Sequence, residues 1–177
     1  REVISEKIQN VNLNIGVVIH TACPPVHSTL SKHMKVNFES LNFIFESLRY
    51  TWLSQQFGQI IFISSSATHF HPEGWENYIA SKSATENYLK GIQQTYEHYG
   101  LMVNVLSPGR VDTEFSRNLD LDALDALLPE QVAEEVVSIT EKPKYFYTWL
   151  EVNSKKSGTL GFIEHQESLK TSSLKKC

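Results

Sequence analysis

The stretch SSSATHFHPEGWENYIASK, residues 64–82, decides how the rest of the chain is interpreted. Ser65 is followed after thirteen residues by Tyr78, and Tyr78 is followed after four more by Lys82. The pattern predicts a helix from about 77 to 99, on which residues four positions apart share one face. An ammonium close to a phenol favours the phenolate, so we expect Lys82 to lower the pKa of Tyr78. Tyr78 could then exchange a proton with an alcohol or a ketone, while the Ser65 hydroxyl holds the substrate oxygen.

A proton-transfer site of this kind is incomplete by itself. The hydride must come from a cofactor, because no side chain can supply one. A tyrosine and a lysine at this spacing also occur together by chance on helix surfaces. The predicted strands and helices around this stretch are therefore needed to distinguish an active site from a solvated helix face.

Buried strands and long helices alternate along the chain. Short apolar, β-branched runs predict a strand buried on both faces at 15–20, a second buried strand at 59–64 and a third strand at 101–106, and an aromatic, β-branched run predicts a fourth at 145–152. Apolar residues at steps of three and four predict a helix from about 30 to 56, which we expect Gly58 to end. Pro129 is typical of the first turn of a further helix. This alternation indicates an α/β fold with a parallel sheet, in which ligands bind at the carboxyl ends of the strands.

Length and composition indicate one globular domain. The chain has 177 residues, of which 41% are apolar and 20% charged, and its net charge is -4. We expect the domain to cover residues 1–152, followed by a flexible tail, 153–177, that is rich in lysine and serine. The acidic charge argues against nucleic acid as a partner, and no apolar run is long enough to span a membrane. Two cysteines, Cys23 and Cys177, are too few for a disulfide scaffold and favour a cytoplasmic location.

The motifs taken together resemble the short-chain dehydrogenase/reductase family. The similar segments are ISSSA after a strand, YIASK on the next helix, and VNVLSPGRVDTEF, and the resemblance covers roughly residues 15–150. It implies a partial Rossmann-like, doubly wound parallel sheet whose strands match the fourth to the seventh of that fold. It also implies an oxidoreductase that uses NAD or NADP to interconvert a carbonyl and an alcohol in a small substrate.

The resemblance assigns roles to individual residues. It implies that Tyr78 is the general acid and base, that Ser65 positions the substrate oxygen, and that Asn37 supports a proton relay. The catalytic set that it implies is Asn37, Ser65, Tyr78 and Lys82. The cofactor-binding set that it implies is Ala22, Tyr78, Lys82, Pro108, Gly109 and Thr113.

The histidines and Arg110 allow further interpretations. The segment HTACPPVHSTLSKH holds His20, Cys23, His27 and His33. Two prolines and the match to a family loop argue against a metal there, and we expect none. Arg110 could meet an anionic substrate, although it is more often a solvated loop residue.

The chain departs from the family at its beginning. The family carries a glycine-rich turn for the cofactor pyrophosphate, whereas the only early glycine here is Gly16, inside a predicted strand. The strand at 15–20 matches the family's fourth strand, so we expect a segment upstream of Arg1, or a partner domain, to cover that edge. The family's Asn-Asn-Ala-Gly appears as HTAC, in which only Ala22 is kept. The alternative is a non-catalytic binding or structural module within a larger protein.

We also expect a homo-oligomer. The helix predicted from about 30 to 56 is apolar around much of its circumference, wider than the single stripe that a core-facing helix needs. Such a surface would be an aggregation liability in water, and a two-fold interface would bury it. The residues concerned are Phe38, Leu41, Phe43, Ile44, Phe45, Leu48 and Trp52.

Overall fold

The computed structural model describes residues 15–117, 119, 126–141, 147–154 and 160–165. Five strands form one sheet, in the order β1-β2-β3-β4-β5. Their bounds are β1 (Val17–His20), β2 (Gly58–Ile63), β3 (Leu101–Pro108), β4 (Tyr147–Ser154) and β5 (Leu160–His165). Strands β1 to β4 run parallel to one another, and β5 is antiparallel to β4. The predicted parallel α/β sheet is confirmed.

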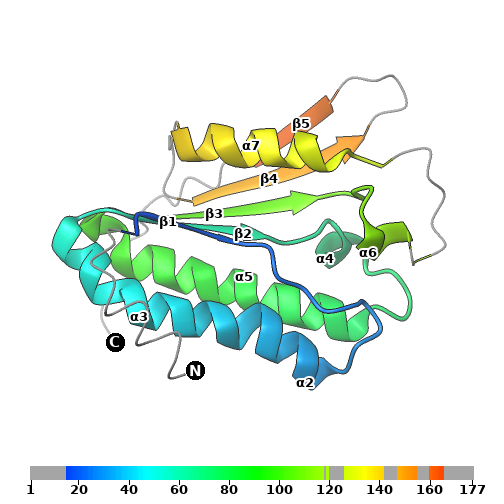
Figure 1. The fold of residues 1–177 in the computed structure, drawn as a ribbon, viewed down its shortest axis with the longest axis horizontal. Helices are drawn as coiled ribbons and strands as arrows, with labels where there is room; N and C mark the ends of the chain where they lie inside the picture. Colours follow the sequence, from blue (N-terminus) through cyan, green and yellow to red (C-terminus); the bar gives the residue numbers. More distant parts are fainter. Residues whose placement is uncertain (1–14, 118, 120–125, 142–146, 155–159, 166–177) are drawn as a thin grey trace, which may run out of the picture.

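Helices cover both faces of the sheet, as a doubly wound fold requires (Figure 1). One face carries α2 (Leu30–His33), η1 (Met34–Glu39), α3 (Ser40–Gln55), α5 (Glu76–Tyr96) and η2 (Glu97–Tyr99). The other face carries α7 (Pro129–Glu141), which begins at the predicted proline. Two short helices, α4 (Ala67–Phe70) and α6 (Glu114–Arg117), follow the ends of β2 and β3. No helix in the described ranges combines the length and the apolar character needed to cross a membrane.

The main core lies between the sheet and the layer of α3 and α5. Buried side chains from both helices interlock there with alternate residues of β2 and β3, for example Leu41, Trp52, Leu89, Phe62 and Val103. A second cluster, built around Ile61, Leu106 and Ile139, packs α7 on the opposite face. Successive residues of a strand point to opposite faces, so β2 and β3 contribute side chains to both clusters.

The long helical run predicted from 30 to 56 forms, with two differences. It contains six residues of π-helix, η1, between α2 and α3. It also ends at Gln56, whose left-handed backbone (φ 52°) closes α3, and Gly58 is the first residue of β2. The prediction that Gly58 ends this helix is therefore wrong. Gly58 has a packing role instead, because a Cβ there would lie 2.5 Å from the Trp52 ring.

The two ends of the sheet also differ from the sequence prediction. Strand β1 is the edge strand among the described residues, and Ile19 in it is 48% exposed, so burial on both faces is wrong for this strand. Residues 160–165, which were assigned to a flexible tail, form β5, with His165 paired with Trp149. A short strand gains its backbone partners only from its neighbour, and composition does not reveal that neighbour.

Candidate active site

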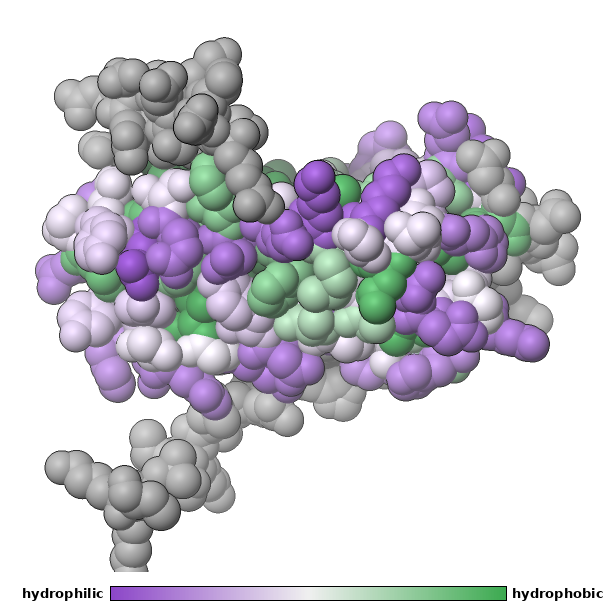
Figure 2. All heavy atoms as spheres, turned by 90° about the horizontal axis from the view of Figure 1, so that it is seen from below, coloured by the Kyte–Doolittle hydropathy of each residue, from purple (hydrophilic) through white to green (hydrophobic). Residues whose placement is uncertain are grey.

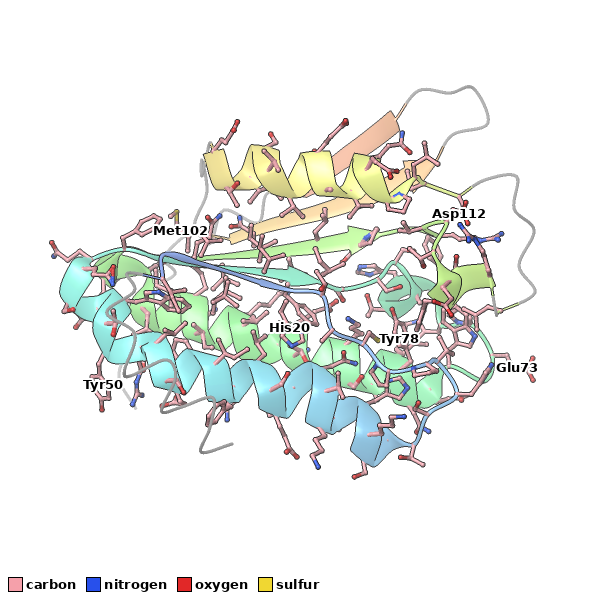
Figure 3. All side chains as sticks on the ribbon, viewed as in Figure 1. His20, Tyr50, Glu73, Tyr78, Met102 and Asp112 are labelled. Atoms are coloured by element: carbon pink, nitrogen blue, oxygen red, sulfur yellow. The ribbon has the colours of Figure 1, made fainter. Side chains whose placement is uncertain are left out.

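The candidate site lies where β2 and β3 end beside the first half of α5 (Figure 3). The chain after β2 stays attached to β3, because Ser64 N–H donates to the Leu106 carbonyl (2.8 Å) and Ser66 N–H to the Pro108 carbonyl (3.0 Å). Ser65 lies between these two anchors, and its Oγ accepts a hydrogen bond from the backbone of Ala67 at 3.2 Å. The predicted strand-end serine therefore has a fixed position opposite α5.

Tyr78 is enclosed by other rings and is 5% exposed. The ring centroids of Trp75, His33 and Phe115 lie 5.7, 5.8 and 6.1 Å from its own. Burial raises the pKa of Tyr78, and a hydrogen bond with Ser65 opposes that rise. The contact between Ser65 and Tyr78 joins the first two residues of the predicted site.

Lys82 is 2% exposed and lies on the same face of α5, one turn after Tyr78. Its Nζ donates to the Ile63 carbonyl at 2.7 Å and lies 4.7 Å from the centre of the Phe62 ring. The distance from Nζ to the centre of the Tyr78 ring is 5.9 Å. Burial lowers the pKa of Lys82, while the charges of Cys23 and Glu86 oppose that change.

The expected lowering of the Tyr78 pKa by Lys82 is not what the structure shows. The ammonium is engaged by the Ile63 carbonyl, and burial of the phenol dominates, so the pKa of Tyr78 moves upward. A buried phenolate loses its hydration, and this loss is the largest effect on the Tyr78 pKa.

Asn37 approaches the same stretch of α5 from η1 and is fully buried. Its Nδ2 donates to Ser81 Oγ at 2.9 Å, and Ser81 Oγ donates in turn to the Tyr78 carbonyl at 2.8 Å. The Asn37 Oδ1 atom has no hydrogen-bond partner among the described residues. Asn37 therefore joins the site at the turn of α5 that separates Tyr78 from Lys82, with one acceptor unused.

The residues expected to bind the cofactor are only partly gathered. Pro108 ends β3 and is joined to the strand-end loop through Ser66. Gly109 and Thr113 are half-buried, and Thr113 leads into α6, which carries Phe115 towards the Tyr78 ring. Ala22 is exposed, and its neighbour Cys23 packs with the cluster that contains Tyr78.

The sequence patterns assign no role to two buried polar residues near the site, Glu86 and Ser64, and indicate His20 only as a possible metal ligand. Glu86 is 7% exposed, and Ser64 Oγ donates to its Oε1. Burial raises the pKa of Glu86 to about 7, and the bond from Ser64 and the charge of Lys82 oppose that rise. His20 lies at the end of β1 with its Nε2 2.9 Å from Ser40 Oγ (Figure 3), and burial, with the charge of Lys82, lowers its pKa to about 4.

A signal for one of these residues was present in the sequence. Glu86 follows Lys82 by four positions and Tyr78 by eight, so all three share one face of α5. Ser64 is the first serine of the quoted stretch. His20 ends an apolar strand, and nothing in its neighbours indicates which group it faces.

The remaining histidines do not gather. Within the residues that the structure describes, no three His, Cys, Asp or Glu side chains lie close enough together to hold a metal ion. His33 is buried with its Nε2 2.9 Å from the Val26 carbonyl, and His27, His69 and His71 are exposed.

Comparisons with known proteins agree on a family. The family model described as short chain dehydrogenase matches residues 8–123. The chain is 28% identical over 88 residues to the 3-oxoacyl-acyl-carrier-protein reductase FabG of Buchnera aphidicola, covering 50% of this chain and 36% of the relative. It is 25% identical over 135 residues to carbonyl reductase family member 4 of Xenopus tropicalis, covering 72% of this chain and 56% of the relative. The chain thus spans from about a third to little more than half of these relatives.

Solved structures show the same fold. A 4-hydroxyisoleucine dehydrogenase mutant complexed with NADH and succinate aligns with a TM-score of 0.75 at 15% identity, covering 90% of this chain and 75% of its own. A gluconate 5-dehydrogenase from Burkholderia cenocepacia, in complex with NADP and tartrate, aligns with a TM-score of 0.73 at 17% identity, covering 89% and 70%. Because the family model matches more than half of the sequence, the chain belongs to the short-chain dehydrogenase family.

Proposed function

We propose that the protein is an NAD(P)-dependent oxidoreductase that interconverts a carbonyl and an alcohol, with Tyr78 as the general acid and base. The observation that carries this proposal is the meeting of Ser65, Tyr78 and Lys82 at the carboxyl ends of β2 and β3. Ligands bind at this edge of open parallel sheets. The dehydrogenases and reductases among its relatives support the same reaction class.

In this proposal each side chain has one task. The Tyr78 hydroxyl gives its proton to the carbonyl oxygen during reduction and takes it back during oxidation. The raised pKa of Tyr78 makes the free phenol a weak acid, so in this proposal the bound substrate and cofactor must lower it. Ser65, which lies beside the Tyr78 phenol, would hold the substrate oxygen next to that proton. The Lys82 charge would stabilise the negative charge that develops when the phenol gives up its proton.

The residues present fit the nicotinamide end of the cofactor. When bound, a nicotinamide cofactor supplies or accepts the hydride. Asn37 Oδ1 and Ser107 Oγ are buried and have no hydrogen-bond partner among the described residues, and Ser107 precedes Pro108 at the end of β3. We propose that these atoms, Lys82 and the 108–113 loop hold the nicotinamide ribose and carboxamide.

Two further partners belong to the proposal. An upstream segment or a partner domain would pair with β1, because its Ile19 is half exposed at the edge of the described sheet. A second copy would pack on the face formed by α3 and α5. Figure 2, seen from that side, shows apolar residues gathered along the middle of the face between hydrophilic ones. At this surface the half-buried rings of Phe38 and Tyr88 lie 5.1 Å apart.

One observation favours the alternative, a non-catalytic binding or structural module. Tyr78 packs among Trp75, His33 and Phe115 and is only 5% exposed. Such packing is also what a purely structural tyrosine would show. The two proposals differ in what removal of the hydroxyl does.

Tyr78→Phe, made in the full-length protein, tests the choice. Loss of the proton donor should lower kcat for carbonyl reduction by at least about a hundredfold, the range of general acid catalysis. The fold should persist, because the ring and its packing remain. Tyr99→Phe, an exposed tyrosine at the end of η2, is the matched control and should keep full activity. Turnover of Tyr78→Phe within threefold of the parent would exclude Tyr78 as the acid.

A further inference from the structure

Three consecutive residues at the end of β2 contact three successive turns of α5. The Ile63 carbonyl accepts from Lys82 Nζ, Ser64 Oγ donates to Glu86, and Ser65 lies close enough to the Tyr78 phenol to lower its pKa. The three helix residues are spaced by four, so they form one row along the helix. The contact between Ser64 and Glu86 is the one that the proposed proton transfer does not use.

This contact lies between two parts that the reaction needs held in place. Ser64 is also bonded through its backbone to Leu106 of β3, so the side of the contact that belongs to the sheet is rigid. Glu86 belongs to the middle of a helix of 21 residues whose buried face packs on the same sheet. A hydrogen bond between them fixes the distance from the strand end to α5. Ser65 and the Ile63 carbonyl are the immediate neighbours of Ser64, so the same hydrogen bond also fixes how far they lie from α5.

We propose that Ser64 and Glu86 form a clamp, and that Glu86 is a positioning residue that aligns Ser65 with Tyr78 and the Ile63 carbonyl with Lys82. The proposal rests on the proposed function for its catalytic consequence, although the clamp itself is a feature of the fold. Positioning matters because displacement of a catalytic group by about 1 Å can cost about a hundredfold in rate.

The surroundings of Glu86 agree with this role. The groups that face its carboxyl are Ser64 at the end of β2, Thr68 of α4, and Lys82 and Lys90 of α5. A carboxyl this deeply buried is costly unless it is hydrogen-bonded, and Ser64 supplies such a bond.

Three variants of the full-length protein separate the clamp from simple packing. Glu86→Leu and Ser64→Ala remove the hydrogen bond, whereas Glu86→Gln keeps an acceptor oxygen for Ser64. Glu130→Gln, an exposed glutamate in the first turn of α7, is the control. Each variant is measured for kcat and KM towards a carbonyl substrate, and for hydrogen exchange of the Ser64 and Ser66 amides.

The clamp predicts that Glu86→Leu and Ser64→Ala lower kcat at least tenfold while KM stays within threefold, and that Glu86→Gln keeps kcat within threefold. In the same two variants the Ser64 and Ser66 amides should exchange at least tenfold faster. The Val103 amide, bonded to Gln93 at 2.7 Å, should be unchanged within twofold. If these amides exchange as in the parent, or if Glu86→Gln loses as much turnover as Glu86→Leu, the clamp is wrong. Hydrogen exchange can be measured whether or not the protein is active. A parent without activity would therefore refute the proposed reaction, and the exchange rates would still decide whether the clamp exists.

Discussion

Glu86 should make the folded chain less stable as the pH rises through neutrality. Its pKa is about 7 in the folded chain, against an ordinary value of 4.5 that applies when the chain unfolds. The folded state therefore binds this proton more tightly than the unfolded state. The resulting stability is fully present below pH 4.5 and is lost as the pH rises to 7. By linkage, the loss in the free energy of unfolding is about 3 kcal/mol.

His20 should act in the opposite direction. Its pKa is about 4 in the folded chain and 6.5 when unfolded, so the unfolded state binds this proton more tightly. The stability that follows is fully present above pH 6.5 and is lost as the pH falls to 4, again about 3 kcal/mol. Burial is the main cause of both changes, and the charge of Lys82 acts on both groups. Between pH 4.5 and 6.5 the two contributions should nearly cancel in the parent.

Removing one of the two groups should therefore make the pH dependence that it contributes visible as a difference from the parent. Relative to the parent at each pH, Glu86→Gln should gain about 3 kcal/mol of stability as the pH rises from 4.5 to 7, and His20→Gln should lose about 3 kcal/mol as the pH rises from 4 to 6.5. For a chain of 177 residues this corresponds to about 6–12 °C in the unfolding temperature. Thermal unfolding followed by circular dichroism from pH 4 to 8 measures both curves. The difference between the double variant and the parent should be nearly flat between pH 4.5 and 6.5, because the two contributions cancel there.

The free energy of unfolding of each variant is compared with that of the parent at the same pH. The contributions of all other titrating groups cancel in this difference. The reasoning is refuted if the curve for Glu86→Gln runs parallel to that of the parent within about 0.5 kcal/mol, the usual size of an exposed substitution. Glu86 would then titrate as an exposed carboxyl does, and its burial against Ser64 would be wrong.

Other perturbations test the site, the assembly and the fold. Lys82→Ala should weaken NAD(P)H binding, followed by nucleotide fluorescence, and lower turnover, each by at least tenfold, because two roles are lost; binding within twofold of the parent would contradict this. Phe43→Glu, on the α3 face, should shift the full-length protein towards monomer in sedimentation, and a parent that is already monomeric at micromolar concentration would exclude the interface. Gly100→Ala should destabilise by more than about 1 kcal/mol, because Gly100 has φ 78° and a Cβ there would lie 2.0 Å from the Gln56 carbonyl oxygen. Gly91→Ala, on α5 with open space around it, should instead stabilise by about 1 kcal/mol in urea unfolding, and equal effects at the two glycines would contradict the backbone argument.

The sequence by itself determined the α/β alternation and the first members of the site. Apolar runs of β-branched residues and helical steps of three and four are local patterns, and they placed the first three strands and α5 within a few residues. Tyr78 and Lys82 share a face because helix geometry requires it. Ser65 could be added because strands of a parallel sheet present their carboxyl ends at one edge.

Only the tertiary structure decided which polar groups meet and which charges are favoured. Glu86 lies on the same row as Tyr78 and Lys82, yet its importance depends on Ser64 of another element being within hydrogen-bonding distance. The direction of the Tyr78 pKa depends on desolvation by rings that come from three separate segments. The pairing of β5 likewise depends on a second segment, β4. Local periodicity specifies how each segment is shaped, whereas burial and hydrogen bonding are properties of pairs of segments, and only the folded chain brings those pairs together.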